Sequence, residues 1–366
     1  MHDNLKLDIF PHIFPRPFFE RVKAQAEGNP GLASVLKRWL DIPVLWDLDA
    51  RLRMMRRFRG YKQVLTLSLP AIEFLAGPED SPMLARLAND GMAEIVAAYP
   101  EQFPAFVASL PMNNVPAALE EMDRAIGTLG AKGVQVFTHV NGRPLDEPEF
   151  FPVFERCVMQ YDLPIWLHPT RTSKFADYVT ESKSKYEIWW LFGWPYETSA
   201  CMARIVFSGM LDRLPRMKVI THHCGAMAPF FEGRLGPGMD QMGARTSDED
   251  YGGLLKRMSK RPIDYFRMFY ADTSVNGSAS AIRCGLDFFG AKRVLFGTDC
   301  PFDPEGGPMF IRETIRAIGS LKLKQADARK LYYENALGMM RLDLPMSRPA
   351  KSRSRPHARR KPKGRT

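Results

Sequence analysis

The sequence has few cysteines, no long apolar run and only seven histidines. The first two features exclude several classes of protein. The five cysteines in 366 residues are odd in number and include no Cys-x-x-Cys pair. This pattern excludes a disulfide framework and a cysteine-based zinc site, and it predicts reduced thiols in the cytoplasm. No run of about 18 uncharged apolar residues exists, so no membrane span is expected. The N-terminus has no basic region followed by an apolar stretch, so no secretory signal is expected either.

The formal net charge of +10 comes almost entirely from one end of the chain. Nine Lys and Arg residues and no acidic residue lie between positions 347 and 366, and removing these nine from 51 leaves 42 basic against 41 acidic residues. A segment of that composition cannot bury apolar surface. We therefore predict one folded domain over residues 1–345 and a disordered basic tail over 346–366. Specific nucleic-acid binding is not expected, because only this solvated tail would support it.

Short apolar runs rich in Val, Ile, Leu and Phe alternate with helical patterns, as in sheets whose strands are buried on both faces. The predicted strands are Leu5–Phe10, Gln63–Leu67, Phe103–Leu110, Gly133–Phe137, Pro164–Leu167, Lys218–Thr221, Met268–Ala271 and Arg293–Phe296. Predicted helices include Val115–Leu129, Phe151–Gln160 and Ser199–Leu211.

Eight strands in alternation with helices favour an α/β fold of the (β/α)₈ TIM-barrel class over the alternative, a doubly wound open sheet. Two stretches, Pro15–Trp46 and Arg171–Pro195, are too long for bare loops. We interpret them as helical insertions after strands one and five. In a barrel they would lie at the carboxyl-terminal face, where active sites form.

Polar residues follow several of these predicted strands. His12 follows the first, His168 ends the fifth, His222 and His223 end the sixth, and Asp299 ends the eighth. In a closed barrel these strand ends converge on one mouth. Imidazole and carboxylate ligands suit a borderline divalent cation, with Zn²⁺ preferred and Mn²⁺ or Fe²⁺ as alternatives.

A catalytic zinc site typically has three protein ligands and one open position. His12, His168 and Asp299 are the predicted ligands, which leaves His223 free to act as an acid or base. Asp299 is a second candidate for proton transfer. His139 lies before a turn, and we expect it to be a surface residue or to support the ligands indirectly.

Several motifs resemble one known family, the metal-dependent amidohydrolase-related decarboxylases, which include aminocarboxymuconate-semialdehyde decarboxylase and γ-resorcylate decarboxylase. The resemblance covers about Lys6 to Leu342. The segments that carry it are Trp46-Asp47, Leu110-Pro111-Met112, Asn141-Gly142-Arg143-Pro144, His168-Pro169-Thr170, Pro195-Tyr196-Glu197-Thr198, His223-Cys224-Gly225, Pro229-Phe230-Phe231-Glu232-Gly233-Arg234 and Gly297-Thr298-Asp299-Cys300-Pro301-Phe302.

This resemblance implies that His168 and Asp299 bind a metal and that His223 is the histidine beside it, with His222 as a structural neighbour. It also implies that Arg234 reaches a substrate carboxylate across a dimer interface, so a homodimer or larger homo-oligomer is expected. Trp190 and Phe230 would supply flat walls for a ring.

One position departs from the family pattern. The family usually has His-x-His or Glu-x-His after the first strand, whereas here Phe10 takes the first of these positions and only His12 remains. Phenylalanine cannot bind a metal, so we expect a weakened site with one divalent ion held by three ligands.

The predicted reaction is non-oxidative decarboxylation of an aromatic or conjugated carboxylic acid, which makes the chain a carboxy-lyase. A hydrolase of a lactone, cyclic amide or related bond is the alternative, because one barrel and one type of site support both reactions. A barrel that has lost its metal and only binds a ligand is a further alternative, supported by Phe10 alone.

Overall fold

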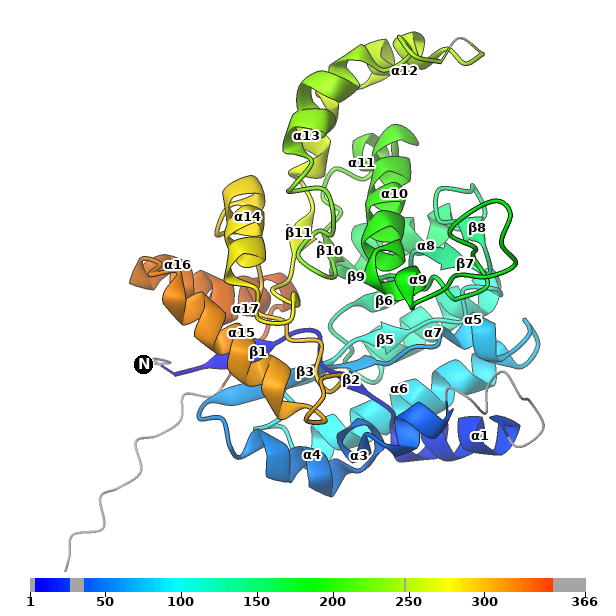
Figure 1. Cartoon of the computed structure of the whole chain (residues 1–366). Coiled ribbons are helices and arrows are strands. Elements are labelled where there is room, and N and C mark those ends of the chain that lie inside the picture. The colour runs from blue at the N-terminus through cyan, green and yellow to red at the C-terminus, as the bar shows by residue number, and fades with distance from the viewer. Residues whose placement is uncertain (1–3, 27–35, 247, 345–366) are drawn as a thin grey trace, which may run out of the picture.

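The computed structural model describes residues 4–26, 36–246 and 248–344. The basic tail predicted over 346–366 lies outside these residues. The part that is described is a ring of short parallel strands with helices packed around it (Figure 1).

The strands of the ring run in sequence order around it. They are β1 (Lys6–Asp8), β2 (His12–Ile13), β3 (Tyr61–Leu67), β4 (Ala105–Phe106), β5 (Ala108–Ser109), β6 (Val134–Phe137), β9 (Ile165–His168), β10 (Val219–Thr221) and β11 (Tyr270–Ala271). β3 pairs in parallel with β1, β2 and β4, and the series β5, β6, β9, β10 and β11 is parallel throughout. A separate antiparallel hairpin joins β7 (His139–Val140) and β8 (Arg143–Pro144).

Backbone hydrogen bonds close the ring at the segment predicted to be strand eight. Val294 forms a parallel bridge with Ala271 in β11. On the other side, the Ile9 N–H donates to the Phe296 carbonyl at 3.0 Å and the Asp299 N–H donates to the Phe10 carbonyl at 3.2 Å. The segment is too irregular to form a regular strand over Arg293–Phe296, but it occupies the eighth place of a barrel. The TIM-barrel class predicted from the sequence is the fold observed.

The helices lie mostly between successive strands, as a βαβ pattern requires. They are α1 (Arg16–Ala26), α3 (Pro43–Trp46), α4 (Leu48–Met55), α5 (Ile72–Leu75), α6 (Ser81–Ala98), α7 (Val115–Gly127), α8 (Phe151–Glu155), α9 (Ile188–Leu191), α10 (Gly193–Phe207), α11 (Met210–Arg213), α12 (Tyr251–Arg257), α13 (Pro262–Phe266), α14 (Ala279–Phe289), α15 (Pro308–Ser320), α16 (Gln325–Arg329) and α17 (Asn335–Met340). In the described part of the chain, three short segments are π-helical, namely η1 (Arg156–Tyr161), η2 (Arg234–Gly238) and η4 (Lys330–Glu334). One segment, η3 (Met239–Gln241), is a 3₁₀-helix. Among the described residues, no helix has the length and apolar character needed to cross a membrane.

Of the three predicted helices, one differs from the observed helix at its start and another differs in its geometry. The helix predicted from Val115 starts there because the side chain of Asn114 accepts a hydrogen bond from the Ala117 N–H at 3.2 Å. The helix predicted from Ser199 starts earlier, because α10 already begins at Gly193. The helix predicted over Phe151–Gln160 begins as α8 and changes to a π-helical turn at Arg156.

An apolar plug fills the interior of the barrel and ends just below the mouth. Leu7, Ile9, Val64, Trp166 and Phe10 belong to it and are at most 1% exposed. The Trp166 indole donates to the Ile9 carbonyl at 2.9 Å and so links β9 to strand one across the barrel. The interior of the barrel is therefore a packed apolar core, and the polar residues at the strand ends lie next to it.

Asp8 connects three strands at the point where the ring closes. Its carboxylate accepts hydrogen bonds from the Tyr61 hydroxyl of β3 at 2.5 Å, the Thr298 N–H at 3.2 Å and the Phe10 N–H at 3.1 Å, and also from the Thr298 hydroxyl. Burial raises its pKa to about 6 in spite of these donors. Asp8 therefore holds strand one to both of its neighbours.

We predict that Asp8→Ala lowers the free energy of unfolding by about 3 kcal/mol, because it leaves buried donors without an acceptor. Chemical denaturation at pH 7 measures this loss. Asp41→Ala, which changes an exposed carboxylate, is the control. Equal stability of the two variants would contradict the assigned role.

Candidate active site

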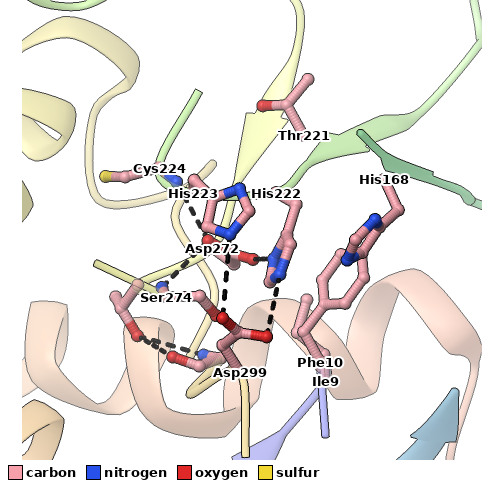
Figure 2. A network of polar contacts seen from close by, with 12 residues as sticks. Ile9, Phe10, His168, Thr221, His222, His223, Cys224, Asp272, Ser274 and Asp299 are labelled. Atoms are coloured by element: carbon pink, nitrogen blue, oxygen red, sulfur yellow. Dashed lines mark hydrogen bonds and ion pairs between the residues drawn. The ribbon is translucent and has the colours of Figure 1, made fainter. Parts of the chain in front are cut away.

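Five polar residues meet at the carboxyl ends of the barrel strands. We call them the mouth cluster: His12 of β2, His168 of β9, His222 and His223 after β10, and Asp299 of the closing segment. In Figure 2 the side chains of His222 and His223 point toward Asp299, and His168 lies beside the ring of Phe10. Residues remote in the sequence meet here because parallel strands all end at the same rim.

Asp299 is the common partner of the cluster. Its Oδ1 atom lies 3.2 Å from His12 Nε2 and 3.5 Å from His222 Nε2, and its Oδ2 atom lies 3.8 Å from His223 Nε2. Burial alone would raise the pKa of Asp299, but its contacts with three histidines outweigh burial and hold the pKa well below its usual range. Asp299 is therefore an ionised carboxylate within a ring of imidazoles.

Burial lowers the pKa of three of the histidines, His12, His168 and His223, and so favours their neutral form. Burial lowers the pKa of His168 well below its ordinary value, and the neighbouring imidazoles add to the effect. The Nδ1 atom of His168 lies 2.6 Å from the Pro169 carbonyl, a contact that requires Nδ1–H and leaves Nε2 without a proton. Neutral imidazole is the form that binds metal ions.

His222 is oriented by a buried carboxylate from the neighbouring strand. Its Nδ1 atom pairs with Asp272, which also accepts the N–H groups of Cys224 and Ser274, each at 3.0 Å. Both side chains of the pair are 0% exposed. Burial opposes a charge on the imidazole, but Asp272 and then Asp299 raise the pKa of His222 to about 9. The pair fixes the ring so that Nε2 faces the mouth cluster.

A left-handed turn positions His223. Four consecutive residues have positive φ angles: His223 at 57°, Cys224 at 58°, Gly225 at 75° and Ala226 at 55°. For residues other than glycine, this conformation costs about 1–2 kcal/mol each. The bond from Cys224 to Asp272 and a 3.0 Å bond from the Met227 N–H to the Ser199 hydroxyl hold the turn in place. Asp299 also has a positive φ, 62°. Strain concentrated at such residues is typical of functional sites.

The donor atoms of the cluster suit a cation. The ligating atoms of His12, His168 and His222 all lie within 4.8 Å of one another, as do those of His222, His223 and Asp299. Among the described residues, both ring nitrogens of His12, Nε2 of His222 and Nδ1 of His223 are buried without a hydrogen-bond partner. Buried imidazole nitrogens left in this state are costly unless an ion or a ligand engages them. The residues therefore fit a divalent metal.

Trp194, which belongs to the predicted insertion Arg171–Pro195, contacts the cluster. Its ring stacks near His223 with centroids 6.0 Å apart and meets His168 edge-on at 5.8 Å. Trp190 stands behind it, 6.4 Å from Trp194, and its indole donates to Glu187 at 2.7 Å. The sequence signal that could have favoured Trp194 is its position at the start of α10, immediately before the Pro195-Tyr196-Glu197-Thr198 motif.

The other two predicted substrate residues lie on the surface after β10. Phe230 is 79% exposed and contacts Phe231 at 5.1 Å. Arg234 is exposed at the start of η2, with its guanidinium 5.9 Å from the Phe231 ring. The fold thus groups His12, His168, His223 and Asp299 and leaves Arg234 and Phe230 outside that group within one chain.

A hollow of about 290 Å³ lies among the loops that follow β3, β6 and β9, and no residue of the mouth cluster lines it. Its lining includes Glu73, His139, Thr170 and Lys174. His139 Nε2 lies 3.2 Å from Glu197, a carboxylate that also accepts the Thr170 N–H at 3.2 Å, so His139 supports the loop after His168. Glu73 is 5% exposed with no side-chain hydrogen-bond partner for Oε1 among the described residues.

The chain is similar to a family of known proteins over most of its length. Residues 32–342 match a family model described as "Amidohydrolase". The chain is 32% identical to 2-amino-3-carboxymuconate-6-semialdehyde decarboxylase from Dictyostelium discoideum over 70% of this chain and 67% of that protein.

Two solved structures have the same fold. The 5-carboxyvanillate decarboxylase of Sphingomonas paucimobilis superimposes with a TM-score of 0.79 at 25% identity, covering 93% of this chain and 100% of the other. A dihydroxybenzoic acid decarboxylase from Polaromonas, solved with manganese and 2-nitroresorcinol, gives a TM-score of 0.72 at 25% identity, covering 92% and 97%.

The isolation of Glu73 leads to a prediction about pH. Burial raises its pKa from 4.5 to about 7, so the folded chain binds more protons than the unfolded chain between these values. The stability contributed by Glu73 therefore falls as the pH rises from about 4.5 to about 7. We expect Glu73→Gln to raise the free energy of unfolding on the order of 2 kcal/mol at pH 8 and to change it little near pH 4.5.

Thermal denaturation at both pH values measures this difference. Glu79→Gln, a change at an exposed carboxylate, is the control and should show no such dependence. A gain from Glu73→Gln that is equal at the two pH values would refute a titrating buried carboxyl.

Proposed function

The chain belongs to the amidohydrolase family, and within it we propose a metal-dependent carboxy-lyase that decarboxylates an aromatic or conjugated carboxylic acid without oxidation. The observation that carries this proposal is the mouth cluster, a set of imidazoles and one carboxylate in a chain similar over most of its length to decarboxylases. The substrate is a small carboxylate, and no nucleic acid or membrane is involved.

His12, His168 and Asp299 are the proposed ligands of one divalent cation. A donor set of imidazoles and one carboxylate favours a borderline ion. Zinc is the predicted ion, and manganese is the first alternative because the Polaromonas relative contains it. When bound, the cation acts as a Lewis acid that holds and polarises a substrate oxygen.

Proton transfer is the work of His223 and Asp299. The carbon that carries the carboxylate gains a proton, the bond to the carboxylate then breaks, its electron pair restores the conjugated system, and CO₂ leaves. His223 Nε2 lies 3.8 Å from Asp299 Oδ2, which is longer than a hydrogen bond. The protonated imidazole of His223 is therefore the proposed donor to the substrate carbon, and the Asp299 carboxylate favours the charged form of that imidazole. The strained turn at His223 keeps the imidazole in this position before substrate binds.

Aromatic side chains form the walls for the substrate ring. Trp194 stands against both His168 and His223, and Trp190 extends this wall outward. Both tryptophans belong to the insertion after β9, which is proposed to exclude water from the mouth. The five cysteines are unpaired, which supports a reducing compartment such as the cytoplasm.

We further propose a homodimer or a larger homo-oligomer. The segment with α12 and α13 projects from the barrel (Figure 1), and α12 buries none of its residues within one chain. Exposed aromatic residues, including Tyr196 and Phe192, lie on α10 and just before it. In this assembly Arg234 and Phe230 reach the site of a second copy, where Arg234 pairs with a substrate carboxylate.

Activity and metal content test the reaction together. We expect about one divalent ion per chain. A panel of hydroxybenzoates should yield CO₂, and Asp299→Asn should lower kcat/KM by about 10²- to 10⁴-fold because it removes a ligand and a proton carrier. Asp287→Asn, at a 68% exposed carboxylate, is the control. Full activity of protein stripped of metal, or ring opening of lactones without CO₂ release, would count against the proposal.

Mixing two inactive variants tests the shared site. Arg234→Ala and Asp299→Asn should each be inactive alone. After unfolding and refolding together, random dimers should regain about a quarter of the native activity, because half of them contain one site with both residues intact. Arg245→Ala, on the same projecting segment, should remain active. Absence of regained activity in dimers shown by light scattering to be mixed would exclude the contribution across the interface.

A further inference from the structure

Phe10 occupies the position after strand one where a first metal ligand is expected. It is 0% exposed and lies directly beneath the mouth cluster. Its ring centroid is 5.9 Å from that of His12 and 6.0 Å from that of His168. An apolar ring therefore fills the place of a ligand, and three protein ligands would remain if nothing replaced it.

His222 lies on top of this ring. The two rings stack with centroids 4.0 Å apart and an angle of 24° between their planes (Figure 2). The His222 centroid is 4.8 Å from that of His168 and 5.7 Å from that of His12. The imidazole thus borders the space above Phe10, from the opposite side of the barrel.

The free nitrogen of His222 faces this space. Nδ1 is committed to Asp272, whereas Nε2 is buried, has no hydrogen-bond partner among the described residues, and lies 3.5 Å from Asp299 Oδ1. Histidines that bind metals typically donate their other nitrogen to a carboxylate, which fixes the orientation of the ring. The Asp272–His222 pair has this arrangement.

We propose that His222 is a metal ligand that replaces the one missing at Phe10, so that His12, His168, His222 and Asp299 hold the cation. This assignment rests on the proposed metal centre, and a cation bound at Nε2 would displace the proton that Asp272 and Asp299 otherwise favour on His222. It moves one ligand from strand one to strand six and leaves His223, the next residue, free for proton transfer. Phe10 then supports the replacement ligand by stacking against it.

Metal affinity tests the assignment without reference to catalysis. Purified full-length chain is freed of metal with a chelator and titrated with Zn²⁺ in competition with a chromophoric chelator. We expect His222→Gln to lower the affinity by about 100-fold or more, the upper end of what loss of a supporting residue costs. Adding Phe10→His to that variant should restore the affinity to within about tenfold, since it returns an imidazole to strand one.

A second variant gives a direct spectroscopic signature. His222→Cys would place a thiolate at the same position, and Co²⁺ bound to it should show an intense sulfur-to-metal charge-transfer band that the native chain lacks. His139→Cys and His139→Gln are matched controls, because His139 also pairs with a carboxylate but lies outside the mouth cluster. Neither control should change the affinity or produce the band.

The outcomes separate this inference from the proposed reaction. Unchanged Zn²⁺ affinity in folded His222→Gln, together with no new band in His222→Cys, overturns the assignment even if the chain releases CO₂. If the affinity falls, Phe10→His rescues it and the band forms, His222 is a ligand even if no aromatic acid is decarboxylated. A native chain that binds no divalent ion would overturn the assignment as well.

Discussion

Closure of the barrel between strand one and the final strand segment is the constraint on which the site depends. His12 and Asp299 are separated by most of the chain, and the bonds that join Phe10 to Asp299 and His12 to Cys300 bring them within 3.2 Å. Asp8 strengthens the same seam from inside. The geometry of the mouth cluster therefore follows from how the ring closes. A change that weakens this closure would displace His12 and Asp299 relative to each other.

The cluster combines one buried negative charge with several imidazoles, and this balance determines its chemistry. Asp299 remains ionised because three histidines surround it, while burial keeps His12 and His168 neutral. Without a cation, several buried nitrogens have no partner. A divalent ion would satisfy these nitrogens and the carboxylate together, which explains why so many polar groups can be placed at the top of an apolar core.

The sequence predicted the barrel and most of the cluster because both follow from strand ends, and strand ends are visible as short apolar runs followed by polar residues. It was less informative where tertiary contacts decide. Strand eight satisfies its backbone through irregular bonds, so no pattern marks its exact form. His222 was interpreted as a structural neighbour, because neither its pairing with Asp272 nor its stacking on Phe10 can be read from local sequence.

Moving a ligand from strand one to strand six would change the polarity around the cation as well as the identity of its ligands. Phe10 is continuous with the apolar plug that includes Ile9 and Trp166. With an aromatic ring in place of a polar ligand, this plug reaches the mouth cluster, so a cation held there would have apolar surroundings on that side. Electrostatic interactions are stronger where the surroundings are less polarisable. Phe10 removes one ligand from strand one. Its apolar ring would at the same time strengthen the attraction between a bound cation and the remaining ligands.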